Sequence, residues 1–200
     1  IDKDQARPFR PGKMSSTPVQ GKTLYIPYMN DASYILAATL RSCGIESYSL
    51  PMQNDKDLEI GRKYTSSKEC FPMICTTGSF VKKLQEQGTD PSKTSFFMPD
   101  HNGPCRFGQY NKFQRIIFNR LGYDQAEIIS PSNDGSYEDI TGSATTKFRT
   151  NVWKGFVIVD LFRKLLQERR PYELIKGSTN KVYYQALDNL VKCIENNGKD

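Results

Sequence analysis

Short apolar runs alternate with amphipathic helical periods along residues 22–130. The predicted strands cover four short runs, at 23–28, 47–50, 94–98 and 126–129. The helices predicted between them cover 31–42, 69–86 and 106–120. Strands that alternate with helices at this short spacing indicate a parallel sheet with helices on its faces. We therefore predict an α/β fold, flavodoxin-like or Rossmann-like, with an open, mainly parallel sheet of about four strands.

The flanking segments have different patterns. Residues 1–21 are rich in Pro, Gly, Ser and Thr without periodicity, which is typical of a linker or flexible arm. Residues 22–146 form the predicted α/β domain, in which 51–67 and 131–147 read as polar connections. Within 147–200, helical periodicity predicts C-terminal helices that pack on this domain, and their expected spans are 150–168 and 179–196.

Hydropathy and charge exclude some classes of protein. No apolar run has the length of a membrane span, and no secretory leader pattern is present. The chain starts at Ile1 rather than Met, so we expect a piece of a larger multidomain protein. The net charge is +6, but segment 1–22 carries +3 and segment 147–176 carries +5. Because the charge is not a stripe interleaved with exposed aromatic residues, it argues against nucleic-acid binding.

The cysteines indicate a reducing compartment. Five cysteines at irregular spacing do not form a disulfide framework, and no CxxC motif indicates structural zinc. We therefore expect reduced thiols and a cytoplasmic protein. Cys43 and Cys193 are interpreted as packing residues because both lie late in amphipathic helices. Cys75 is also interpreted as a packing residue, because it lies about 140° around the helix from Cys70 and the two thiols cannot easily reach one ion.

Two cysteines fall where ligands collect in α/β proteins. Cys70 lies in the first turn of the predicted helix at 69–86, and Cys105 directly precedes the one at 106–120, both at the carboxyl edge of the sheet. A thiolate at a helix N-terminus has a lowered pKa and serves as a nucleophile or a metal ligand, and paired thiolates select iron–sulfur clusters or zinc. The alternative for each is a small buried apolar side chain. His101 is either a donor to a cluster sulfur or a surface histidine, and segment 61–69 is either an anion-binding or a solvated loop.

Three sequence stretches resemble a known family. They are Gly-Arg-Lys-Tyr-Thr-Ser-Ser-Lys-Glu-Cys-Phe-Pro at 61–72, Gly-Pro-Cys-Arg-Phe-Gly-Gln-Tyr at 103–110 and Arg-Pro-Tyr-Glu at 170–173. Over about 22–195 the chain is similar to the large anaerobe proteins known as CoA-substrate-specific enzyme activases. These are relatives of the activator and dehydratase components of 2-hydroxyacyl-CoA dehydratase.

The resemblance implies a cofactor and a partner. Related subunits hold a [4Fe–4S]-type cluster on cysteines, and an actin-like ATPase module drives electrons into them at low potential. Because they lie in the matching stretches, the resemblance implies that Cys70 and Cys105 are cluster ligands. It also implies an acyl-CoA-related molecule as the substrate. Cationic donors stabilise a reduced cluster, which is the role expected of Arg62, Lys68 and Arg106. No phosphate-binding motif for ATP is present in this chain.

The match to a cluster site is incomplete, and this leaves two functions open. The family uses three protein cysteines per cluster, and only two here fit. Either the third cysteine ligand lies beyond Asp200, or a neighbouring subunit supplies it, or the isolated domain holds no cluster. The first hypothesis is an iron–sulfur-binding, electron-transfer or reductase-type domain that is inactive in isolation. The alternative is a non-catalytic interaction domain of the same large protein, with a partner on basic segment 147–176.

Overall fold

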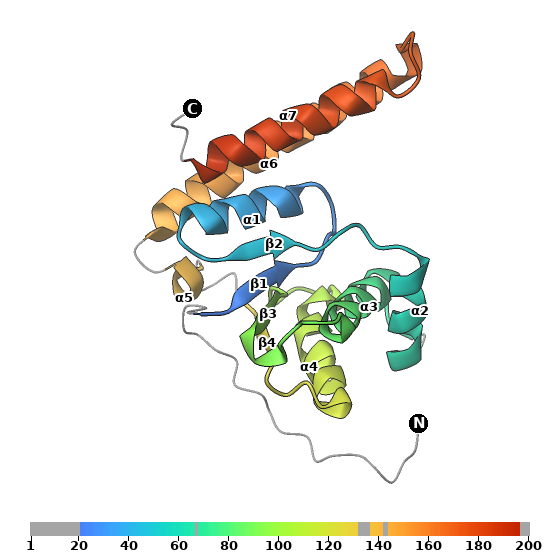
Figure 1. The fold of residues 1–200 in the computed structure, drawn as a ribbon, viewed down its shortest axis with the longest axis vertical. Coiled ribbons are helices and arrows are strands. Elements are labelled where there is room, and N and C mark those ends of the chain that lie inside the picture. The colour runs from blue at the N-terminus through green and yellow to red at the C-terminus, as the bar shows by residue number, and fades with distance from the viewer. Residues whose placement is uncertain (1–20, 67, 132–136, 142–143, 197–200) are drawn as a thin grey trace.

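Four parallel strands form the centre of the molecule, in the order β2-β1-β3-β4 (Figure 1). The computed structural model describes residues 21–66, 68–131, 137–141 and 144–196. The strands are β1 (Thr23–Ile26), β2 (Ser47–Ser49), β3 (Thr94–Phe97) and β4 (Glu127–Ile129). Tyr25 pairs with Tyr48 on one side and Phe96 on the other, and Phe96 in turn pairs with Ile128. The predicted α/β fold with an open parallel sheet is confirmed.

Helices cover both faces of this sheet. They are α1 (Ala32–Ser42), α2 (Asp55–Tyr64), α3 (Phe71–Gln85), α4 (Tyr110–Leu121), α5 (Glu138–Thr141), α6 (Thr145–Arg169) and α7 (Ser178–Glu195). Short 3-10 turns are η2 (Pro91–Lys93), η3 (Arg106–Gln109) and η5 (Arg170–Tyr172). Side chains alternate across strand β3, so Phe96 packs towards α3 and α4 whereas Phe97 packs towards α1 and α6.

Three phenylalanines form the centre of the core beneath α3 and α4. Phe80, Phe96 and Phe118 are each fully buried and come from α3, β3 and α4. The ring centroids of Phe80 and Phe96 are 4.5 Å apart, and those of Phe96 and Phe118 are 5.4 Å apart at an edge-to-face angle. This packing anchors α3 and α4 on one face of the sheet through residues in the second half of each helix.

Helix α2 lies inside the segment predicted as a polar connection, so that prediction was wrong. Local capping explains the helix: the Asn54 side chain accepts from the backbone N–H groups of Lys56 and Asp57, and Asp57 accepts from Asn54 N. Asp57 is only 3% exposed, and Lys82 Nζ lies 3.0 Å from its Oδ2. Segment 61–64 is consequently helical, and only the residues after Tyr64 form a loop.

Two glycines allow α2 and α3 to approach backbone to backbone. A Cβ atom on Gly78 would lie 1.8 Å from the carbonyl oxygen of Asp57, and one on Gly61 would lie 2.1 Å from the carbonyl oxygen of Ile74. Neither position can accept a larger side chain without separating the helices. The pair therefore fixes α3, and with it the segment that carries Cys70, relative to α2.

The C-terminal helices form an antiparallel hairpin that packs on α1. Ile35 of α1 meets Val159 of α6 and Tyr183 and Leu187 of α7 in one buried cluster. Figure 1 shows α6 and α7 running side by side and extending past α1. Helix α6 begins at Thr145 and α5 occupies 138–141, so the predicted loop at 131–147 is partly helical. The predicted arm at 1–21 lies, apart from Gly21, outside the described residues.

We expect Gly78→Ala to lower the free energy of unfolding by about 2–3 kcal/mol. The new methyl group meets the backbone of α2, and this overpacking outweighs the roughly 1 kcal/mol that alanine gains within a helix. Urea denaturation followed by circular dichroism measures the change. Gly61→Ala tests the same approach from α2, because its Cβ would meet the carbonyl oxygen of Ile74, and it should lower the free energy of unfolding by a similar amount. Equal stability of Gly78→Ala and wild type would contradict the close contact.

Candidate functional site

Cys70 is the residue that precedes α3. Its backbone is extended (φ −70°, ψ 148°), and its carbonyl oxygen accepts from the N–H groups of Met73 and Ile74. Pro72 suits the first helical turn, because the missing N–H has no partner there. The thiol of Cys70 makes no capping bond to its own helix and is partly buried. It is therefore free to face a neighbouring element.

Cys105 holds the equivalent position before η3, which continues directly into α4. Its backbone is also extended (φ −73°, ψ 133°), and its side chain is exposed. Gly103 and Gly108 stand on either side and both pack against His101, one against the imidazole ring and one against the backbone. A Cβ on either glycine would lie about 2 Å from His101 atoms. The glycines of this motif therefore shape the loop that presents Cys105.

Tyr110 connects the two segments. This first residue of α4 is only 3% exposed, and its hydroxyl shares a hydrogen bond with the thiol of Cys70, in which either group can donate. Burial raises the pKa of Tyr110, and the hydrogen bond and negative charge of Cys70 and the charge of Cys105 raise it further. Both thiols thus lie within electrostatic reach of one phenol. Tyr110 ends the sequence stretch 103–110, but no local pattern in the sequence predicts its contact with Cys70.

The loop before Cys70 is held by its own glutamate. The Glu69 carboxylate accepts from Ser66 N and Ser66 Oγ, both at 2.9 Å, and from Lys68 N at 3.1 Å. Desolvation acts to raise the pKa of Glu69, but these hydrogen bonds hold it below its usual range. Arg106 Nη1 donates to the Lys68 carbonyl oxygen at 3.3 Å. This bond joins the Cys70 loop to the Cys105 loop across 38 residues of sequence.

The three predicted cationic donors have different surroundings. Arg106 lies next to Cys105 and contacts the Lys68 backbone, so both residues belong to the joined loops. Arg62 lies on α2 and lines an open hollow with Asp55, Leu58, Glu59 and Lys63. Burial and the charge of Asp57 raise the pKa of the Cys75 thiol, and the charge of Arg62 acts against them.

The remaining cysteines lie on other elements. Cys43 ends α1 and packs partly against the core on the α1 face, whereas Cys193 on α7 is exposed rather than packed. Among the described residues, no group of three or more His, Cys, Asp and Glu side chains is placed to hold a metal ion. The candidate site therefore consists of the thiols of Cys70 and Cys105 and the phenol of Tyr110.

The raised pKa of Tyr110 predicts a loss of stability at alkaline pH. An unfolded tyrosine ionises near pH 10, whereas folded Tyr110 stays protonated, so its stabilising effect is complete below pH 10 and is lost as pH rises further. Burial and a hydrogen bond to Asp31 raise the pKa of Tyr28 and Tyr183 in the same direction. Tyr110→Phe should therefore reduce, but not abolish, the fall in unfolding free energy between pH 9 and pH 11, measured by urea denaturation. A fall as steep as that of wild type would contradict the prediction.

Comparison with known proteins gives one partial match. No family model matches the chain, and no solved structure matches it. Metal transporter cnnm-2 of Caenorhabditis elegans is 31% identical over 101 residues, which are 47% of this chain and 12% of the transporter. The chain thus spans about one eighth of that relative's length. In the described part of the chain, no helix has both the length and the apolar character needed to cross a membrane.

Proposed function

We propose that this chain is an iron–sulfur-binding, electron-transfer domain of an ATP-driven system similar to 2-hydroxyacyl-CoA dehydratase. Cys70 and Cys105 would be its protein ligands to a [4Fe–4S]-type cluster. The observation that carries the proposal is Tyr110, which bonds the Cys70 thiol and lies within electrostatic reach of Cys105. The Arg106–Lys68 hydrogen bond supports it as well, because it joins the loop that carries Cys105 to the loop that carries Cys70 at the carboxyl edge of a parallel sheet.

Each residue of the site has a distinct role in this proposal. Neither Cys70 nor Cys105 uses its thiol to cap the helix that follows it, so both thiols remain available as ligands. Tyr110 orients the Cys70 sulfur and donates to it when it is a thiolate, which favours ligation. Arg106 holds the two loops together and places a positive charge near an anionic group. When bound, the cluster would supply one-electron transfer at low potential.

The same proposal specifies what other molecules contribute. The third cysteine ligand would come from a part of the parent protein outside 1–200 or from a neighbouring subunit. ATP hydrolysis would belong to an actin-like module, because this chain has no phosphate-binding motif. An acyl-CoA-related molecule would be the substrate, and the cytoplasm would be the compartment.

An interaction domain without a cluster is the second candidate. Exposed apolar side chains on the α6–α7 hairpin favour it, because such surfaces mark contacts with partners. The two candidates differ in iron content. A domain that carries the cluster contains iron and acid-labile sulfide after anaerobic purification of the parent protein, whereas an interaction domain contains neither.

We expect Cys70→Ala and Cys105→Ala each to lower iron incorporation at least tenfold, because each removes one of two protein thiolates (about 1.4 kcal/mol corresponds to tenfold). The protein is reconstituted anaerobically with iron, sulfide and an added thiol, and is measured by iron analysis, thiolate-to-iron absorbance and EPR.

Two cysteine variants serve as controls. Cys193→Ala removes an exposed thiol, like that of Cys105, and Cys75→Ala removes a thiol from α3, the helix that follows Cys70. Both should bind iron as wild type does. Iron incorporation by Cys70→Ala and Cys105→Ala equal to that of wild type would show that the ligand assignment is wrong.

A further inference from the structure

A continuous apolar stripe runs along the outer side of α6. Its four members recur every fourth residue, which places them on one face of the helix over about 18 Å. With their exposed fractions they are Trp153 (72%), Val157 (53%), Leu161 (52%) and Leu165 (43%). We call these four residues the α6 stripe. Solvated helix faces are normally polar, so a four-turn apolar stripe needs a partner.

The described part of the chain leaves this stripe uncovered. Helix α6 packs on α1 and α7 through its other side, with Phe148, Gly155 and Val159 buried. At the end of the hairpin, Leu174 is fully exposed and Ile175 is 74% exposed. In Figure 1 the hairpin extends beyond the sheet and its helices, so a partner can approach it from outside.

The charges that border the stripe are mainly positive. Arg149 and Arg169 stand one turn before and one turn after it in the same column of residues. Lys154 and Lys164 lie beside its members and are exposed. The acidic neighbours are Asp160 and Glu168, and Glu168 lies 3.9 Å from Lys164. A surface that fits this border has an apolar centre with an excess of carboxylates around it.

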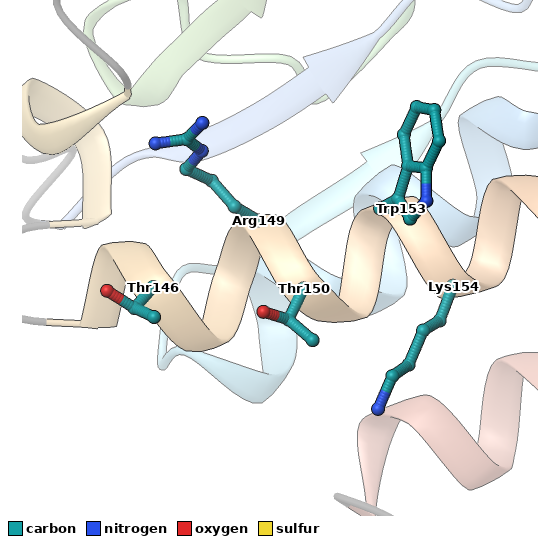
Figure 2. Close-up of a pocket in the computed structure, with 5 residues that line it drawn as sticks. All are labelled: Thr146, Arg149, Thr150, Trp153 and Lys154. Atoms are coloured by element: carbon teal, nitrogen blue, oxygen red, sulfur yellow. The ribbon is translucent and has the colours of Figure 1, made fainter.

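Figure 2 shows the first turns of this surface. Arg149 and Trp153 project together from one side of α6, whereas Lys154 points to the other. With Thr146 and Thr150 they line an open hollow of about 450 Å³. An apolar side chain of a partner can rest against the indole in this hollow while its acidic neighbours reach the two cations.

Two other occupants fit less well. A second copy of the chain would bring one basic segment of net charge +5 against another, which is repulsive. An anionic lipid surface would attract the net positive charge of segment 147–176, but burying the stripe in it would also take Asp160 and Glu168, which lie on the exposed side of the helix, out of water beside headgroups of like charge. An acidic protein helix meets neither obstacle, because its carboxylates can be placed opposite the cations.

We propose that the α6 stripe docks an amphipathic helix of a partner protein or module, with an apolar stripe bordered by Glu or Asp. The apolar side chains of the two helices would interdigitate along a seam of about four turns, as in other packed helix pairs. This proposal is independent of the iron–sulfur site, because it uses no residue of α3, η3 or α4.

Trp153 is the single tryptophan of the chain, so its fluorescence reports docking directly. The probe is a tryptophan-free peptide of roughly 18 residues, with leucines at helical spacing and glutamates along both borders. A sister peptide carries lysine in place of each glutamate. We expect the glutamate peptide to shift Trp153 emission to the blue saturably, to bind at least tenfold more tightly than the lysine peptide, and to weaken with added salt.

Variants of the full chain test which surface is used. Leu161→Ser should weaken binding of the glutamate peptide about tenfold, because it places a hydroxyl in the middle of the stripe. Val182→Ser is the matched control: Val182 is an exposed apolar residue of α7, outside the stripe, and its variant should bind within about twofold of wild type. Circular dichroism shows whether each variant keeps its helices.

Five outcomes would overturn the proposal. Three concern the peptides: no shift with the glutamate peptide, equal affinity for the two peptides, or equal losses of affinity in Leu161→Ser and Val182→Ser. A shift that depends on protein concentration, together with a dimer in sedimentation, would identify a second copy as the occupant. A shift with phosphatidylglycerol vesicles but not with the peptide would identify a lipid surface.

Discussion

The hydrogen bond between Cys70 and Tyr110 connects the two segments on which the candidate site depends. Without it, the beginnings of α3 and α4 are two neighbouring helix ends on one face of the sheet. With it, a buried phenol holds one thiol and lies within electrostatic reach of the other. The tyrosine is itself fixed because Phe107 packs edge-to-face against its ring, with centroids 5.1 Å apart. The position of the Tyr110 hydroxyl is therefore determined by side-chain packing rather than by the exposed loops.

Strand and helix periodicity predicts most of this fold, since burial on both faces of a parallel sheet produces short, continuous apolar runs. The strand at 94–98, for example, becomes β3, in which all four residues are buried. Helix α2 is not predictable in this way, because Asn54, Asp57 and Gly61 act through capping, an ion pair and a backbone contact with Gly78. A capping box with acidic residues in the first turn is the signal that could have located it.

The site was predictable to a similar extent. Cys70 and Cys105 were both expected where a helix begins, and each stands immediately before one. The role of Tyr110 depends on a contact across 40 residues, so no local pattern contains it. The position of Arg62 follows from α2: when segment 61–64 becomes helical, its side chain is carried to the outer side of that helix, beside Glu59 and Lys63.

The positive charge of segment 147–176 is explained by α6, a long helix with two different sides. Its buried side packs on α1 and α7, and cations border the uncovered apolar stripe on its other side. The thiols lie across the sheet from this hairpin, because α3 and α4 cover one face and α1 and α6 the other. A partner on α6 would therefore leave the thiol edge open. Under the proposed function, docking and electron exchange would use different faces of the domain.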